Sequence, residues 1–206
     1  MKSQFFKKNV HDIIRGVRAI NPNGVGNSEL SSQEKHFLNT CLAESYSEIS
    51  STDMNIKMNA IQKLVYLNML GFDISSVQFC VVELMSSSKF HHKRVGYLAA
   101  IQSFSEDSEM ILLATNQIKK DLVSQKSYEA ELVLNALSVF MNADLAEILL
   151  DDILSLIGSS KMNVRRRAIL LIYKIYLIDP SIILPHLEAV FNRTLSIKQD
   201  HWGGVF

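Results

Sequence analysis

The sequence predicts an all-α fold, an α-α superhelix of the HEAT or armadillo type with about ten helices in antiparallel pairs. Apolar residues recur at helical spacing along most of the chain, and short breaks containing Gly, Asp, Ser or Pro separate the apolar runs. No segment shows the sustained two-residue alternation of β-branched residues that marks a strand. With 206 residues, 48% of them hydrophobic, the chain is expected to form a single domain.

The first helix is expected from about Ser3 to Ile20, with an apolar stripe beside a basic polar edge. Asn21-Pro22-Asn23-Gly24 ends it, and the loop continues to Glu29 because Pro and Gly oppose helix continuation. A second helix begins at Ser31, since Ser31-Ser32-Gln33-Glu34 has capping-box spacing. Residues 1–50 are therefore predicted to form a first hairpin with a basic first helix.

Residues 51–195 are predicted to form four helix-pair repeats, followed by an irregular tail at 196–206. The repeats recur with a period of roughly 34 to 40 residues, which is in the range of HEAT and armadillo arrays. They are expected at Lys57–Ser86, Lys93–Gln125, Glu129–Leu156 and Val164–Leu195.

Glycines and capping residues divide these repeats. Gly71 is expected to supply a left-handed helix stop, and Gly96, inside a helix, to allow close approach of an adjacent helix. Helix starts are predicted after Ser105 or Asp107, after Asn142, and at Asp179-Pro180.

The charge balance is even, with 21 basic and 21 acidic residues, which argues against nucleic-acid binding through an overall positive field. The first residues do not form a secretory signal, and no span approaches the ~20 apolar residues that cross a bilayer. We therefore expect a cytoplasmic protein with at most peripheral membrane association. Cys41 and Cys80 fit reduced, buried thiols better than a disulfide.

No motif indicates catalysis, a metal site or a cofactor. His91 and His92 are adjacent and point to different sides of a helix, and no residue completes a zinc spacing with them. Cys80 lies in an apolar run where a thiolate would be poorly stabilised. An enzyme is the least favoured class.

One basic cluster, Arg165-Arg166-Arg167, opens a helix, where positive charge opposes the helix dipole. Either these arginines form a solvated or intersubunit ridge, or they contact an acidic partner or lipid headgroups.

Three segments carry a family resemblance: KLVYLNMLGFDIS, SSSKFHHKRVGYLAAIQSF and LLATNQIKKDLVS. In order and spacing they resemble the N-terminal trunk of the adaptins, the large subunits of clathrin-adaptor-type complexes. Among the adaptins, the sequence of these segments is most similar to the delta-adaptin subfamily of the third adaptor complex. The resemblance covers Asp12 to Leu195, and the tail departs from the family at Trp202 and Gly203. The chain is accordingly expected to be the first part of a longer trunk, or a shortened product.

The resemblance also implies site residues. Ile14-Arg15-Gly16-Val17-Arg18 is similar to the family segment in which the second arginine faces the acidic residue of a dileucine signal, which assigns Arg18, with Arg15, to cargo binding. In the related alpha adaptin a lysine triplet contacts phosphoinositide. Of that triplet only Lys57 is present here. The resemblance therefore implies Lys57 as a residue that contacts lipid or an acidic partner.

The resemblance implies a non-enzymatic segment of an adaptor heterotetramer, sorting cargo from Golgi or endosomal membranes toward lysosomes or vacuoles. The implied partners are a small sigma subunit, a beta-type large subunit, a mu subunit, dileucine-motif cargo tails and an Arf-type GTPase. The alternative is a freestanding helical-repeat scaffold or transport receptor that binds linear peptides.

Overall fold

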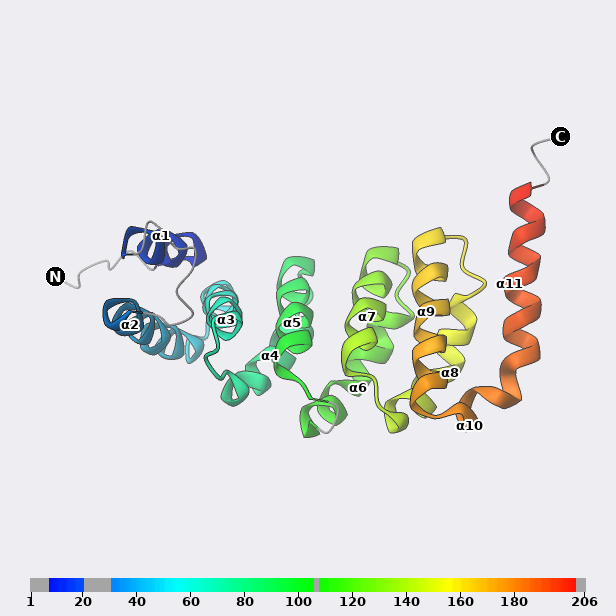
Figure 1. Ribbon diagram of the computed structural model, residues 1–206. Helices are drawn as coiled ribbons and strands as arrows, with labels where there is room; N and C mark the ends of the chain where they lie inside the picture. The colour runs from blue at the N-terminus through cyan, green and yellow to red at the C-terminus, as the bar shows by residue number, and fades with distance from the viewer. Residues whose placement is uncertain (1–7, 21–30, 106–107, 203–206) are drawn as a thin grey trace. The chain divides into compact units, whose positions relative to one another are not determined.

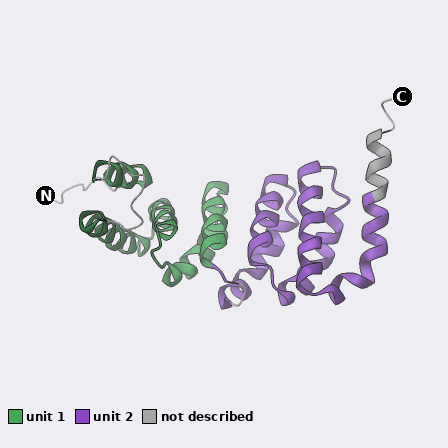
Figure 2. Ribbon diagram, in the orientation of Figure 1, with its two compact units in different colours: residues 1–103 green, residues 104–206 purple. Residues whose placement is uncertain are grey.

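Every regular element in the described part of the chain is a helix (Figure 1). The computed structural model describes residues 8–20, 31–105 and 108–202, with the backbone alone for 195–202. No strand occurs in these ranges, so the predicted all-α class is confirmed. The chain divides into two compact units, Met1–Ser103 and Phe104–Phe206 (Figure 2), and the boundary falls inside the expected repeat Lys93–Gln125.

Unit 1 contains five α-helices and one short 3-10 helix in its described residues. They are α1 (Val10–Ile20), α2 (Ser32–Ile49), α3 (Met54–Met69), η1 (Ser75–Val77), α4 (Gln78–Met85) and α5 (Phe90–Ser103). Here α2 packs on α3, α3 on α5, and α4 on α5. The expected loop at Asn21–Glu29 lies outside the described residues.

A helix was predicted from Ser3; residues 3–7 lie outside the described part of the chain, and residues 8 and 9 are not helical. The helix begins at Val10 because the backbone N–H of Asn9 donates to Asp12 Oδ2 at 2.8 Å and that of Asp12 to Asn9 Oδ1 at 3.0 Å. This reciprocal pair satisfies backbone donors at the helix start, as a capping box does. The capping box at Ser31 and Glu34 is confirmed at the start of α2.

Two glycines act as predicted. Gly71 follows α3 with φ +96°, a conformation that glycine adopts without steric cost. Gly96 of α5 lies directly against the backbone of α4, because a Cβ added there would be 2.7 Å from the backbone N of Met85. Close helix approach, rather than a ligand, therefore explains the glycine inside α5.

The core of unit 1 also contains a buried ion pair between α2 and α3. Lys63 Nζ lies 2.6 Å from Glu48 Oε2, and the two side chains are only 2% and 12% exposed. A desolvated charge must be paired, so this contact fixes the relative register of the two helices.

Unit 2 contains the remaining described elements: α6 (Glu109–Leu122), α7 (Ser127–Phe140), α8 (Ala143–Leu156), α9 (Met162–Ile178), α10 (Pro180–Ile183), η2 (Leu184–His186) and α11 (Leu187–Trp202). Asn142 and Asp179 cap α8 and α10 as predicted. The cap of α6 is Ser108, neither Ser105 nor Asp107. The last helix continues to Trp202, beyond the expected end at Leu195.

We predict that Gly96→Ala lowers the free energy of unfolding by about 1–3 kcal/mol, because the new methyl group meets backbone rather than a movable side chain. Urea unfolding followed by circular dichroism measures the change. Gly158→Ala is the control: its Cβ would meet nothing closer than 3.5 Å, so its stability should change little. Equal effects of the two substitutions would contradict the assignment of Gly96 to helix contact.

Candidate functional site

The exposed face of α1 carries the two arginines predicted to bind cargo. His11, Arg15 and Arg18 are all exposed, and their spacing of four and three residues places them on one side of the helix. Asp12, the only acidic residue of α1, is engaged in the cap at Asn9. The helix therefore presents a basic stripe to solvent.

The opposite side of α1 is held against α2. Ile13 is fully buried, and a Cβ added at Gly16 would lie 2.3 Å from Cζ of Phe37 on α2. Lys8, just before the helix, pairs with Glu44 of α2 at 3.0 Å, and its ammonium lies 5.7 Å from the Phe37 ring centroid. The hydrogen bond to Glu44 raises the pKa of Lys8. These contacts orient the stripe outward.

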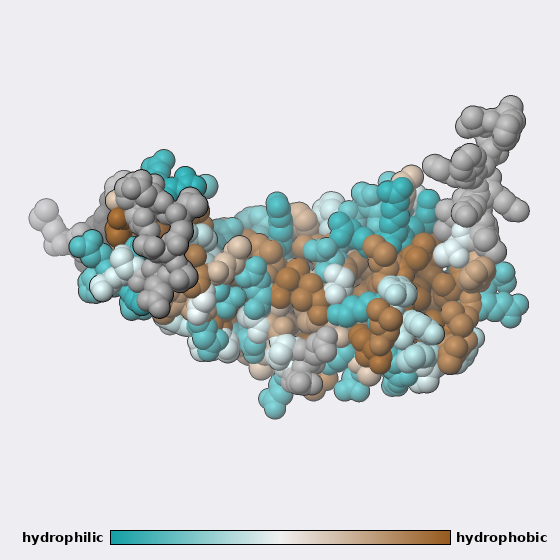
Figure 3. All heavy atoms as spheres, viewed as in Figure 1, coloured by the Kyte–Doolittle hydropathy of each residue, from teal (hydrophilic) through white to brown (hydrophobic). Residues whose placement is uncertain are grey.

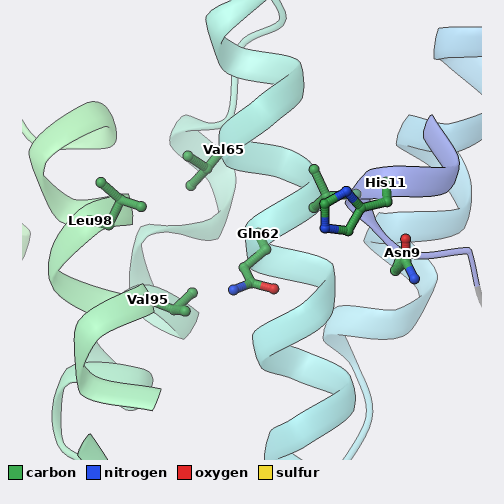
Figure 4. Close-up of a pocket in the computed structure, with 7 residues that line it drawn as sticks. Asn9, His11, Gln62, Val65, Val95 and Leu98 are labelled. Atoms are coloured by element: carbon green, nitrogen blue, oxygen red, sulfur yellow. The ribbon is translucent and has the colours of Figure 1, made fainter. Parts of the chain in front are cut away.

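Beside the stripe lies an open groove of about 360 Å³ formed by α1, α3 and α5 (Figure 4). Its lining consists of Asn9, just before α1, Val10 and His11 of α1, Gln62 and Val65 of α3, and Val95 and Leu98 of α5. Val65 and Val95 are almost buried, whereas Leu98 is 48% exposed. The groove thus has an apolar base and an exposed aliphatic rim.

Two of the three helices that form the groove lack acidic residues. Neither α3 nor α5 contains an aspartate or a glutamate. On α5, His91 and Arg94 are exposed and precede Leu98 at spacings of seven and four residues, so they share its face of the helix. Arg94 therefore lies on the same face of α5 as Leu98, at the rim of the groove.

Lys57, predicted to contact lipid or an acidic partner, is buried on α3. Its ammonium lies 2.5 Å from Glu83 Oε2 of α4, and its side chain is 11% exposed. The ion pair places Lys57 in a helix contact rather than with the stripe on α1. Lipid contact by Lys57 stays a prediction, and this pairing does not favour it.

Arg165, Arg166 and Arg167 lie near the start of α9 in unit 2, and each side chain has different surroundings. Arg165 donates to the carbonyl of Ser159 at 2.9 Å, Arg167 donates to Asn135 Oδ1 of α7 at 2.8 Å, and Arg166 is exposed. Arg166 shares its face with exposed Leu170, Tyr173 and Leu177, and hydrophobic residues gather over this part of unit 2 in Figure 3. The three arginines do not form one cluster.

His92 is buried where α5 meets α3. Its Nδ1 lies 3.0 Å from Ser87 Oγ and its Nε2 lies 3.1 Å from Asn55 Oδ1. Burial lowers the pKa of His92, and the positive charges of His91 and Lys89 add to this effect. His91 is exposed, but its ring centroid lies 4.1 Å from that of His92, so the two rings are in contact and the predicted divergence of the adjacent pair is wrong. Across the described residues, no group of three His, Cys, Asp or Glu side chains could hold a metal ion.

Both cysteines are free thiols, as predicted, although only Cys41 is fully buried. Burial raises the pKa of each thiol. Neither is therefore a reactive thiolate at neutral pH.

Of the predicted site residues, only Arg15 and Arg18 share one exposed surface. No sequence pattern predicted the groove, because Gln62, Val65, Val95 and Leu98 look like ordinary helix residues. The signal that could have indicated it is the lack of acidic residues in α3 and α5.

Helix pairs that stack on their sequence neighbours define a helical-repeat protein. The chain belongs to the Adaptin N terminal region family, whose model matches residues 34–203. It is 44% identical over 180 residues to "AP-3 complex subunit delta" of Dictyostelium discoideum, covering 87% of this chain and 15% of that protein. The predicted resemblance to delta-adaptin is thereby confirmed.

A second relative, "AP-3 complex subunit delta-1" of Bos taurus, is 40% identical over 182 residues, covering 88% of this chain and 14% of the relative. A similar structure is titled "Homology model of the full-length AP-3 complex in an intermediate open conformation". It matches with a TM-score of 0.58 and 38% identity, over 70% of this chain and 25% of that one. The chain thus spans only about a seventh of the length of these two curated relatives. Within the described residues, no helix is both long and apolar enough to cross a membrane.

We predict that unit 1 loses stability as the pH falls, because folded His92 binds a proton more weakly than the unfolded chain does. The contribution is complete above the ordinary histidine pKa of 6.5 and declines below it. Urea midpoints measured from about pH 7.5 to about pH 5.5 should decrease. His92→Gln should flatten this dependence, whereas His36→Gln, at an exposed position of α2, should leave it; equal slopes for both variants would contradict the prediction.

Proposed function

We propose that this chain is a non-enzymatic trunk segment of a delta-type large subunit in an AP-3-like adaptor heterotetramer. Its partners would be a small sigma subunit, a beta-type large subunit and a mu subunit. The assembly would act at Golgi or endosomal membranes, recruited by an Arf-type GTPase, and sort cargo toward lysosomes or vacuoles. Family membership and the identity to delta subunits along most of the chain support this proposal.

The cargo role rests on one observation, the outward basic stripe of α1. Arg15 and Arg18 are exposed, while the only carboxylate of the helix is occupied at its N-terminus. A guanidinium offers fixed donors to a carboxylate, so a stripe of this kind suits the acidic residue of a dileucine signal. The apolar pair of the signal would then contact the small subunit beside α1.

The adaptor role predicts that the chain co-purifies with a sigma-type small subunit in a fixed ratio when the two are co-expressed. A helical-repeat fold leaves apolar helix faces that a neighbouring chain can cover. A freestanding scaffold would not need such a chain. Size-exclusion chromatography with light scattering gives the stoichiometry. Elution of the two chains as separate species would argue for the scaffold alternative.

Arg18→Glu in the assembled complex should lower the affinity for an acidic dileucine peptide by about tenfold or more, because the substitution replaces a charge-assisted contact by repulsion. Isothermal titration calorimetry measures the dissociation constant. Lys35→Glu makes the same change of charge at an exposed position of α2 and should leave the affinity unchanged. Full affinity in the Arg18 variant would remove this residue from the site.

A further inference from the structure

We propose that one exposed face of α9 in unit 2 is a docking surface for an amphipathic helix of a partner protein. This α9 face consists of Arg166, Leu170, Tyr173 and Leu177. The partner helix would lie along α9, with its apolar side on the three hydrophobic residues and a carboxylate at Arg166. This surface goes beyond the proposed adaptor role, which places no contact on unit 2.

Three large hydrophobic side chains of the α9 face are exposed to solvent. Leu170, Tyr173 and Leu177 are 66%, 61% and 63% exposed. Together with Arg166 they follow one another at steps of four, three and four residues, so they form a single stripe about 16 Å long, or three helical turns. Scattered surface leucines are ordinary, but a continuous apolar stripe marks a surface that a partner covers.

The other sides of α9 are fixed within unit 2. The helix packs on α7 and α8, and its buried residues are Val164, Ala168, Leu171, Ile172 and Ile175. On the α7 side, Arg167 donates to Asn135 Oδ1 at 2.8 Å, and Lys174 donates to the carbonyl of Val139 at 2.8 Å. These contacts hold α9 in one orientation, so the stripe is in place before a partner arrives.

The charges of α9 select an acidic residue in the partner. The helix contains four basic residues and no carboxylate. Arg165 and Arg167 donate to oxygen atoms of this chain, whereas Arg166 is exposed at one end of the stripe. The positive end of the helix dipole lies at the same end of α9. A carboxylate of the partner is therefore attracted to Arg166, and a basic residue is repelled there.

The arrangement along α9 favours a helix over a lipid surface. The cation stands at one end and the hydrophobic residues occupy the following turns, so a helix with apolar residues at the same spacing can pack along the stripe. A headgroup layer would gain little from a single exposed arginine. Glutamates in the first turn of a partner helix parallel to α9 would face Arg166 and also complement the dipole of the partner helix.

Fluorescence anisotropy with the full chain tests the proposal. The probe is a labelled synthetic helical peptide with glutamates in its first turn and leucines at steps of four, three and four residues beyond them. In one altered peptide the same residues are rearranged so that the leucines share no face, and in another the glutamates are lysines. We expect the probe to bind and each altered peptide to bind about tenfold more weakly. Equal binding of the three peptides, or no binding, would overturn the proposal.

Variants locate the surface. Leu170→Asp should lower the affinity for the probe about tenfold or more, whereas Leu112→Asp, at an equally exposed leucine of α6, should not. Arg166→Glu should weaken binding, and Lys120→Glu, at an exposed position of α6, should leave it unchanged. Circular dichroism checks the fold of each variant, and Leu170→Ser replaces Leu170→Asp if that variant unfolds. Unchanged affinity in the folded Leu170 variant would overturn the proposal.

Two competing occupants are tested with the same probe. Vesicles of phosphatidylcholine containing phosphatidylserine should not displace the peptide; displacement would assign the α9 face to lipid and overturn the proposal. The peptide should also bind the chain after co-purification with a sigma-type small subunit, because the proposed partner is a different protein. Loss of binding in that complex would assign the face to the small subunit and overturn the proposal. Failure of the two chains to co-purify would concern the adaptor role alone, since the peptide binds the chain by itself.

Discussion

The packing of α5 on α4 at Gly96 is the constraint on which the geometry of unit 1 depends. Met85 N would lie 2.7 Å from any Cβ at this position, so the two helix backbones touch where a side chain would normally separate them. With α5 held at this depth, the adjacent face of the helix turns Val95 and Leu98 toward α3. The groove exists because a glycine, elsewhere a cost to a helix, allows this approach.

The basic residues of unit 1 divide into those that hold helices together and those that face solvent. Three carboxylates of α2 and α4 engage the first group, in the pairs Lys8–Glu44, Lys63–Glu48 and Lys57–Glu83. Of these lysines, Lys63 is the most deeply buried, so leaving it unpaired would cost several kcal/mol. The arginines of α1 are exposed and form no such pair with the residues that the structure describes, which is why they are the better candidates for recognition.

Local signals in the sequence predicted the helices well, because caps and glycine stops act within a few residues. Ser31 with Glu34, Asn142 and Asp179 each cap the helix that their side chains indicated. Non-local features could not be predicted in this way. The partner of Lys57, 26 residues away, and the groove, which joins three helices, depend on packing that no spacing rule encodes. The start of α1 was missed because the Asn9–Asp12 cap lies inside an otherwise helical pattern.

A net charge of zero conceals a strong local asymmetry. Exposed helix faces usually alternate acidic and basic residues, since such pairs add helix stability at little cost. In this chain, α8 alone contains four acidic residues, while α3 and α5 contain none. Helix stability does not explain the absence on α5, because a glutamate in place of Leu98 would lie four residues from exposed Arg94. The exposed arginines of α1 and α5 therefore stand beside two helices, α3 and α5, that carry no carboxylate to neutralise them.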